Sequence, residues 1–267
     1  MKKIIFIAAS FFGLSAQAQT KEGKVVYERV TQMSNMRFGG GANLPPEIQA
    51  QMPKSRTDHF ELLFTPEHSL YQFLPNATDE GGGTFSSGGV TIQMRGGANT
   101  VTYTDFASGT LIDQREIMEK NFLVTDTLTK LQWKMSEETK PILTFTARKA
   151  TGTTVVQRPR MTMENGEMKR EIINDTVKVV AWYTTDVPVP AGPNYAGQLP
   201  GLILELDVNN GQSVTKAIEF SPKVATAKIK APGSGKKLTV AEFNKERDKI
   251  MEEMRKNMPQ GNVIRMQ

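Results

Sequence analysis

Two histidines and five of the carboxylates are the candidates for acid–base chemistry or metal binding. His59 precedes a predicted strand, and His68 lies in a predicted turn; neither has other ligand residues at metal-binding spacing beside it. Hydrolysis of a glycosidic bond would need two carboxylates that converge in space. The alternation of residues 202–208 predicts that the acids there face solvent. The candidates for such a pair are Glu137, Glu138, Asp186, Glu205 and Asp207.

The sequence also lacks the motifs of several other kinds of enzyme. The chain has no cysteine, which excludes thiol catalysis and cysteine-based metal sites. No G-x-S-x-G nucleophile motif occurs, and the glycine clusters match no nucleotide-binding loop. We therefore predict no catalytic, metal-binding or cofactor-binding residues and no cofactor, and we expect a non-enzymatic role more than an enzymatic one.

The first 18 residues have the features of a secretory signal. Lys2 and Lys3 precede an apolar run over residues 4–14, and Ala16-Gln17-Ala18 supplies the small residues that signal peptidase recognises. The run is too short for a membrane anchor. We expect cleavage after Ala18 and a periplasmic or secreted protein that is not a lipoprotein, because no cysteine follows the run.

Charge and hydropathy narrow the possible partners. The formal net charge is +5, and it falls to +3 once Lys2 and Lys3 are removed. A clustered basic face, which nucleic-acid binding normally needs, is not evident, so we expect no nucleic acid. No later segment is apolar for the length of a membrane span, and we expect none in the mature chain.

The mature chain is predicted to be mainly β, because apolar residues alternate with polar ones along most of it. Residues 24–30 form the first such segment, and residues 60–64 and 71–73 form a predicted hairpin. Later segments have the same period, and no helical pattern separates them, which argues against βαβ units. The sets expected to share a face are Leu131, Trp133 and Met135; Leu143, Phe145 and Ala147; Val177, Val179, Ala181 and Tyr183; and Leu202, Leu204, Leu206 and Val208.

Two helices and one insertion complete the predicted domain, which spans residues 19–267. A short helix is predicted over residues 45–52, starting at a proline pair. Residues 76–99 are rich in glycine and are predicted to be a mobile insertion with one weak strand at 90–94. A C-terminal helix is predicted over residues 240–257, where Thr239 and Glu242 form a capping box and Leu238 and Phe243 a hydrophobic staple.

One predicted hairpin has a basic character. Its turn is Glu164-Asn165-Gly166, and its flanks carry Arg158, Arg160, Lys169 and Arg170. A solvated hairpin is the expected interpretation. A contact site for acidic glycans or membrane headgroups is the alternative, and the methionines between 161 and 168 could serve as an adaptable contact surface or as core.

Two segments carry a resemblance to a known family. Residues 180–193 lead into Gly197-Gln198-Leu199-Pro200-Gly201-Leu202-Ile203, and this region resembles the GLPGLI family of exported proteins of unknown activity. Trp133, Lys140 and Lys149-Ala150 are similar to the family's other characteristic stretch. The first glycine of the name motif is displaced here, because Gln198 follows Gly197. A position that is often cysteine in the family is Thr146 here.

The motif residues are first interpreted as structural. Pro200 and Gly201 suit the central positions of a type II turn, with a positive φ at the glycine, and Gly192-Pro193 suits a second chain reversal. The family residues expected to shape this region, with a ligand or partner contact as the alternative, are Trp133, Lys140, Ala181, Trp182, Tyr183, Gly192, Pro193, Gly197, Leu199, Pro200, Gly201, Leu202 and Ile203.

The resemblance implies a fold and three functional hypotheses. Family members look like a curved antiparallel sheet, wrapped into a bowl or half-barrel, and a related bowl-like domain accompanies a secreted peptide N-glycosidase. The first hypothesis is an envelope binding or accessory protein that holds a glycan or apolar ligand or docks on an outer-membrane partner. The second is a secreted hydrolase of glycans or peptides. The third is a structural or assembly factor without a ligand, which docks through Trp182, Pro200 or the basic hairpin.

Overall fold

The computed structural model describes residues 20–33, 50–51, 53–75, 83–87, 90–94, 100–164, 167–257 and 263–266. The predicted signal segment lies outside these residues. So does the predicted short helix, apart from residues 50 and 51, which are helical. Among the described helices, none is long and apolar enough to cross a membrane.

Most of the described chain belongs to one curved β-sheet of 12 strands, as the sequence pattern predicts. The order across it is β14-β8-β7-β6-β3-β2-β1-β13-β12-β11-β10-β9. Its strands are β1 (Gly23–Gln32), β2 (Ser55–Phe64), β3 (His68–Phe73), β6 (Val101–Asp105), β7 (Thr110–Ile117), β8 (Lys120–Thr127), β9 (Lys134–Ile142), β10 (Phe145–Glu164), β11 (Glu167–Thr184), β12 (Leu202–Val208), β13 (Ser213–Ser221) and β14 (Lys236–Thr239).

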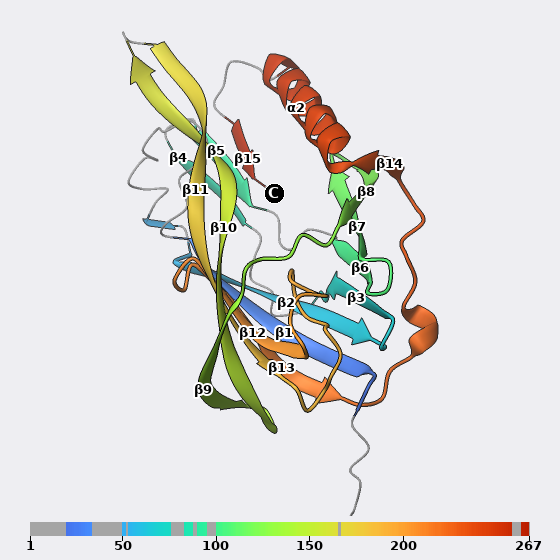
Figure 1. Cartoon of the computed structure of the whole chain (residues 1–267). Helices are drawn as coiled ribbons and strands as arrows, with labels where there is room; N and C mark the ends of the chain where they lie inside the picture. Colours follow the sequence, from blue (N-terminus) through green and yellow to red (C-terminus); the bar gives the residue numbers. More distant parts are fainter. Residues whose placement is uncertain are drawn as a thin grey trace, which may run out of the picture.

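The sheet consists of two meanders that meet at β1. The first runs from β2 through β8, and the second runs from β9 back to β13, which pairs with β1. Figure 1 shows the sheet curving so that β9–β11 rise on one side of the molecule and β6–β8 on the other. The connection from β8 to β9 therefore has to cross between the two sides.

A smaller sheet and a helix stand at the top of Figure 1. β4 (Gly83–Ser87) pairs with β5 (Val90–Met94), which coincides with the strand predicted inside the glycine-rich segment. β15 (Val263–Met266) lies parallel to β5. The helix α2 (Val240–Asn257) has the predicted bounds, and a short 3₁₀ helix, η1 (Thr226–Lys228), precedes β14.

The C-terminal helix begins and packs as its sequence predicts. The Thr239 backbone N–H donates to Glu242 Oε2 at 2.8 Å, and the Glu242 N–H donates to Thr239 Oγ1 at 3.3 Å, which is the capping box. Phe243 and Ile250 are buried against Phe122 and other apolar residues of β7 and β8. The capping box and this apolar contact together explain why the helix forms at this edge of the sheet.

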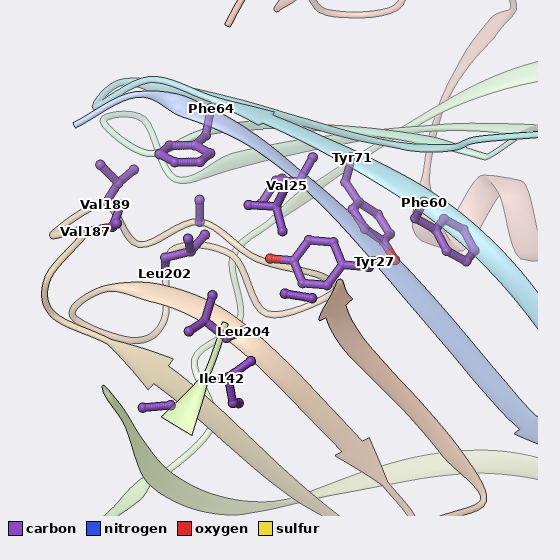
Figure 2. Close-up of a cluster of buried hydrophobic side chains, with 14 residues drawn as sticks. Val25, Tyr27, Phe60, Phe64, Tyr71, Ile142, Val187, Val189, Leu202 and Leu204 are labelled. Atoms are coloured by element: carbon purple, nitrogen blue, oxygen red, sulfur yellow. The ribbon is translucent and has the colours of Figure 1, made fainter. Parts of the chain in front are cut away.

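The largest apolar cluster lies between the β1–β3 part of the sheet and the chain that leads into β12. Figure 2 shows Val25, Tyr27 and Phe64 facing Leu202 and Leu204. The Tyr27 hydroxyl donates to the backbone oxygen of Ile203 at 2.6 Å, so the polar end of this buried ring is paired. Burial raises the pKa of Tyr27 well above its usual value.

The alternation expected for residues 202–208 differs in the structure. Leu202, Ile203, Leu204 and Leu206 are all buried, so β12 is covered on both sides rather than on one. Leu202 and Leu204 pack in the cluster of Figure 2. Ile203 and Leu206 pack with Ala181 and Tyr183 in a second cluster. The ladder between β11 and β12 shifts between Trp182 and Tyr183, and such an irregularity lets a strand bend and change its neighbours.

The expected strands around residues 131 and 143 also begin later than predicted. Leu131 and Trp133 precede β9, and only Met135 of that set is in the strand. Leu143 is exposed and has a φ of 54°, because it lies in the turn between β9 and β10. The expectation that Leu143 shares a buried face with Phe145 and Ala147 is therefore wrong.

Candidate functional site

The family-motif residues centre on residues 185–201, which we call the plug, because this segment fills the space inside the curved sheet. Val187 and Val189 pack in the cluster of Figure 2. The plug is held by backbone hydrogen bonds, since the Ile203 N–H donates to Ala191 O at 2.9 Å and the Gly197 N–H to Pro190 O at 2.6 Å. The interior of the bowl is therefore occupied by the protein's own chain.

Close backbone approach explains the glycines of the plug better than the predicted turn does. Gly201 is not among the described glycines with positive φ, so the type II turn expected at Pro200-Gly201 is wrong. A Cβ at Gly201 would lie 2.0 Å from the Thr184 backbone oxygen. A Cβ at Gly192 would lie 2.5 Å from the Ile203 Cβ. Both positions require glycine because neighbouring chain leaves no room for a side chain.

The plug is fastened to the connection between β8 and β9. Gln198 Oε1 accepts hydrogen bonds from the Leu131 N–H at 3.0 Å and from the Trp133 indole Nε1–H at 3.1 Å. Gly197 has a φ of 80°, and a Cβ there would lie 2.4 Å from Leu128 Cδ1. The plug and the β8–β9 connection, which are far apart in the sequence, thus hold each other in position inside the curved sheet.

Other predicted motif residues are brought together at Trp182, on β11. The Lys140 ammonium lies 4.3 Å from the centre of the Trp182 ring, and it donates to Glu205 Oε1 at 2.6 Å. The Glu205 side chain is only 12% exposed, so the expectation that it faces solvent is wrong. The charges of this pair are partly withdrawn from water, and the ring and the lysine stem cover them.

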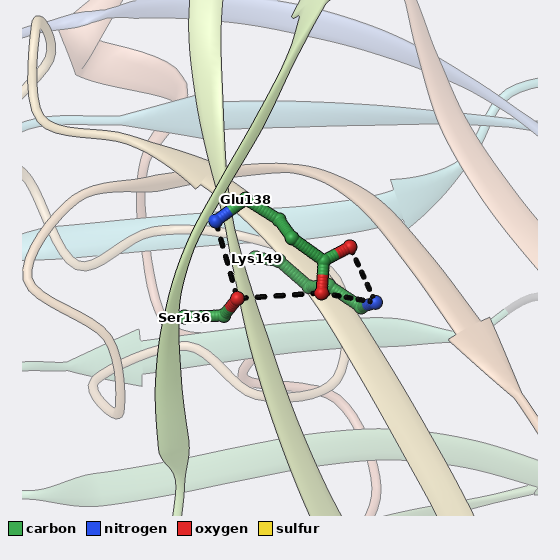
Figure 3. A network of polar contacts seen from close by, with 3 residues as sticks. All are labelled: Ser136, Glu138 and Lys149. Atoms are coloured by element: carbon green, nitrogen blue, oxygen red, sulfur yellow. Dashed lines mark hydrogen bonds and ion pairs between the residues drawn. The ribbon is translucent and has the colours of Figure 1, made fainter.

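A second lysine borders the same ring. Figure 3 shows Lys149 bound to both oxygens of Glu138, at 3.0 and 2.8 Å, while Ser136 contacts the same carboxylate. The Lys149 hydrogen bond is the main cause that holds the pKa of Glu138 below its usual value. This exposed network and the Lys140–Glu205 pair together enclose Trp182 between paired charges.

The remaining predicted motif residues separate into core and surface. Ala181, Tyr183, Leu199 and Ile203 are buried in the second cluster, and Leu202 is buried in the first. Gly192 and Pro193 are also buried, whereas Pro200 is exposed. No contact of Pro200 singles it out as a binding residue in the described part of the chain.

Polar side chains, among them Arg29 and the buried Asp58, lie beside the Phe60 and Tyr71 rings of the largest apolar cluster. The Arg29 guanidinium lies 4.1 Å from the centre of the Phe60 ring and donates to the Tyr71 hydroxyl at 3.0 Å. Burial raises the pKa of Tyr71 to about 12, although the nearby Arg29 opposes the shift. Asp58 is 1% exposed; its Oδ2 pairs with Arg56, and its Oδ1 has no hydrogen-bond partner among the described residues.

The two histidines occupy different places. His59 Nε2 lies 3.8 Å from Glu28 Oε2, and His68 Nδ1 lies 2.9 Å from the Tyr103 hydroxyl. Neither lines either of the two described clefts. The described residues contain no group of three or more histidines or acids placed to hold a metal ion.

Two open clefts are found in the described part of the surface. The first, of about 330 Å³, is lined by Gln72, Phe73, Thr100, Val101, Gln114, Glu116 and Asn121. The second, of about 360 Å³, lies where the ends of β7 and β8 meet the start of α2 and is lined largely by threonines. Sequence reasoning missed the first cleft because its residues lie on four strands and resemble ordinary solvent-facing positions.

One family model matches the part of the chain that contains the plug and Trp182. The family model described as "Protein of unknown function (Porph_ging)" matches residues 133–205, from Trp133 to Glu205, and includes the whole plug. No curated protein sequence matches the chain.

Several solved structures are similar in outline. The structure of PNGF-II superposes with a TM-score of 0.48 and 16% identity; it covers 84% of this chain, which spans about a third (32%) of that one. An uncharacterized conserved protein from Thermus thermophilus superposes with a TM-score of 0.36 and 7% sequence identity. The match covers 82% of this chain and 91% of that one. LprF from Mycobacterium bovis superposes with a TM-score of 0.29 and 8% sequence identity. The match covers 80% of this chain and 90% of that one.

Proposed function

We propose that the chain is an exported GLPGLI-type protein of the cell envelope, and that it acts as a non-enzymatic accessory protein that docks on another protein. The observation that carries this proposal is a projecting arm. We define the arm as residues 152–164 of β10 and 167–178 of β11. It is the predicted basic hairpin, and its two strands pair up to Glu164 and Glu167.

The arm extends beyond its neighbours in the sheet. β9 pairs with β10 only as far as Thr151, and β12 pairs with β11 only from Val179 onward. Figure 1 shows the two strands continuing together past the rest of the sheet. A two-stranded ribbon is marginally stable by itself, so its length suggests stabilisation by a contact outside the described sheet.

The outer face of the arm is apolar at two described positions. Exposed residues alternate with half-buried or buried ones, which gives the ribbon one face toward the molecule and one away from it. On the outer face, Val155 is 62% exposed and Ile172 is 52% exposed. Exposed aliphatic side chains on one face of the arm suit a protein contact.

Site-specific photo-cross-linking in the source cell tests the docking role. A photoreactive residue is placed at Val155 or Ile172 in the full chain, and at the exposed Met118 or Met251 as controls away from the arm. One discrete cross-linked species from both arm positions, lost in the Val155→Asp/Ile172→Asp variant, is expected. The same species from the control positions, or no species from the arm, would contradict the proposal.

The proposed export has a separate test. The mature protein is isolated from the envelope or culture fluid, and its N-terminus is sequenced. We expect the chain to start at Gln19, because cleavage after Ala18 fits signal peptidase. Recovery of the full-length chain from the cytoplasm alone would contradict this part of the proposal.

A further inference from the structure

An open cleft of about 330 Å³ lies between β3, β6, β7 and β8. Gln72 pairs with Val101, and Val101 pairs with Gln114, so these three residues form a row across three strands. Glu116 and Asn121 form the next pair along β7 and β8. Directly paired residues share a face of a sheet, and the row therefore presents its side chains together.

The orientation of one amide in this row is fixed. Gln72 Nε2 donates to Glu61 Oε1 at 3.1 Å, and Glu61 is the partner of Gln72 on β2. With one donor engaged, the rest of this amide is held in a defined position at the cleft. Such fixation lowers the entropy lost when a ligand binds.

The lining has a definite chemical character. Three amides dominate it, and an amide both donates and accepts hydrogen bonds. Glu116 adds acceptors and one negative charge. Among the described lining residues there is no lysine or arginine to serve as the counter-charge of an anionic ligand. Val101, which lies in the same row as the amides, supplies apolar surface beside these groups. This combination suits a neutral ligand whose groups donate and accept at once, as hydroxyls do.

The location of the cleft on a face of the sheet favours a sugar over a peptide as its ligand. A bound extended peptide takes much of its affinity from main-chain pairing with a sheet edge. The cleft lies on a sheet face instead, where the backbone groups of β3, β6 and β7 are already paired with one another. Only side chains are available for contact, which favours a compact ring bearing hydroxyls.

We propose that this cleft is a binding site for a neutral saccharide. Its hydroxyls bond the amides of Gln72, Gln114 and Asn121 and the carboxylate of Glu116, and its apolar face lies against Val101. This site is separate from the arm, so the inference does not depend on the proposed docking role. The shared chemistry, a neutral sugar ring, is present both in free sugars and in glycans carried by a protein or lipid.

Saturation-transfer NMR on the full mature chain tests the proposal with glucose, galactose, mannose and N-acetylglucosamine as probes. We expect transfer of magnetic saturation from the protein to at least one of these neutral sugars. Binding at least tenfold weaker is expected for Gln114→Leu and for Asn121→Ala, which changes an exposed residue with little risk to folding. The matched controls Gln132→Leu and Glu137→Gln alter exposed residues away from the cleft and should bind normally.

The same sugar linked to a neutral polymer separates the two sources. Retention on the polymer together with weak binding of the free sugar indicates a glycan ligand, and binding of the free sugar alone indicates a soluble one; both support the site. The proposal is overturned by no transfer to any of the four sugars, by equal binding in cleft variants and controls, or by preferred binding of glucuronate or of a peptide.

Discussion

Gln198 accepts a hydrogen bond from the Trp133 indole across 65 positions of sequence, at 3.1 Å. The same oxygen also holds the Leu131 N–H, so one side chain joins the plug to the segment that crosses the bowl. Gln198 occupies the place where the GLPGLI name has its first glycine. The residue that departs from the motif it resembles thus makes a structural contact in this chain.

Replacing Gln198 tests the importance of that contact. Gln198→Leu removes the acceptor of two N–H groups that are partly withdrawn from water, and we expect a loss of about 1–3 kcal/mol in the free energy of unfolding. Urea denaturation followed by tryptophan fluorescence measures it. Gln132→Leu, at an exposed position of the same connection, should change stability by less than about 0.5 kcal/mol. Equal effects of the two changes would contradict the assigned role.

Gly201 and Gly211 make a matched pair for the cost of adding a methyl group. Gly201→Ala places a Cβ against the Thr184 backbone oxygen, which cannot move without disturbing β11. We expect a loss of more than about 2 kcal/mol or failure to fold. Gly211 has a φ of 84° and nothing within 4 Å of an added Cβ, so Gly211→Ala should cost only about 1–2 kcal/mol. Thermal unfolding of both variants distinguishes steric conflict from backbone strain.

The two lysines beside Trp182 should differ in energetic importance. A double-mutant cycle of Lys140→Ala and Glu205→Ala should give a coupling of about 1–2 kcal/mol, because the carboxylate is largely enclosed. The cycle of Lys149→Ala and Glu138→Ala should give a smaller and more salt-sensitive coupling, because Glu138 is exposed. A larger coupling for the exposed pair would reverse this assignment.

Buried tyrosines predict a fall in stability at high pH. Burial raises the pKa of Tyr71 from its ordinary value of 10.0 to about 12. Between these pH values the folded chain retains a proton that the unfolded chain loses. The contribution is therefore complete below pH 10 and lost as the pH rises toward 12. Unfolding free energies measured from pH 9 upward should show the decline, and Tyr71→Phe should have a shallower slope. An unchanged slope would place the titration elsewhere, for example at Tyr27.

The sequence predicted local structure well where a short-range pattern decides it. The period of residues 24–30 and 60–73 defines strands, and Thr239, Glu242 and Phe243 define the start of α2. Positions that depend on distant partners were predicted poorly. Nothing near Glu205 in the sequence indicates that Lys140 will cover it, and nothing near Gly201 indicates the proximity of Thr184.

The binding features have the same limitation. The basic hairpin was recognised from its turn, but its isolation depends on where β9 and β12 stop pairing, which the sequence of the hairpin does not contain. The cleft is assembled from amides between residues 72 and 121, each of which is unremarkable at a solvent-facing strand position. Only the register of four strands brings them together.

The central place of β1 has a consequence for how the chain reaches its native state. β1 begins at Gly23, yet one of its two partners is β13, which ends at Ser221. A chain that emerges N-terminus first must expose one edge of β1 until nearly all of the later strands have been made. An unpaired edge is a template for pairing with other chains. We expect newly made protein to need protection from self-association during this interval, and folding to be slow because the ladder between β1 and β13 joins segments far apart in the sequence.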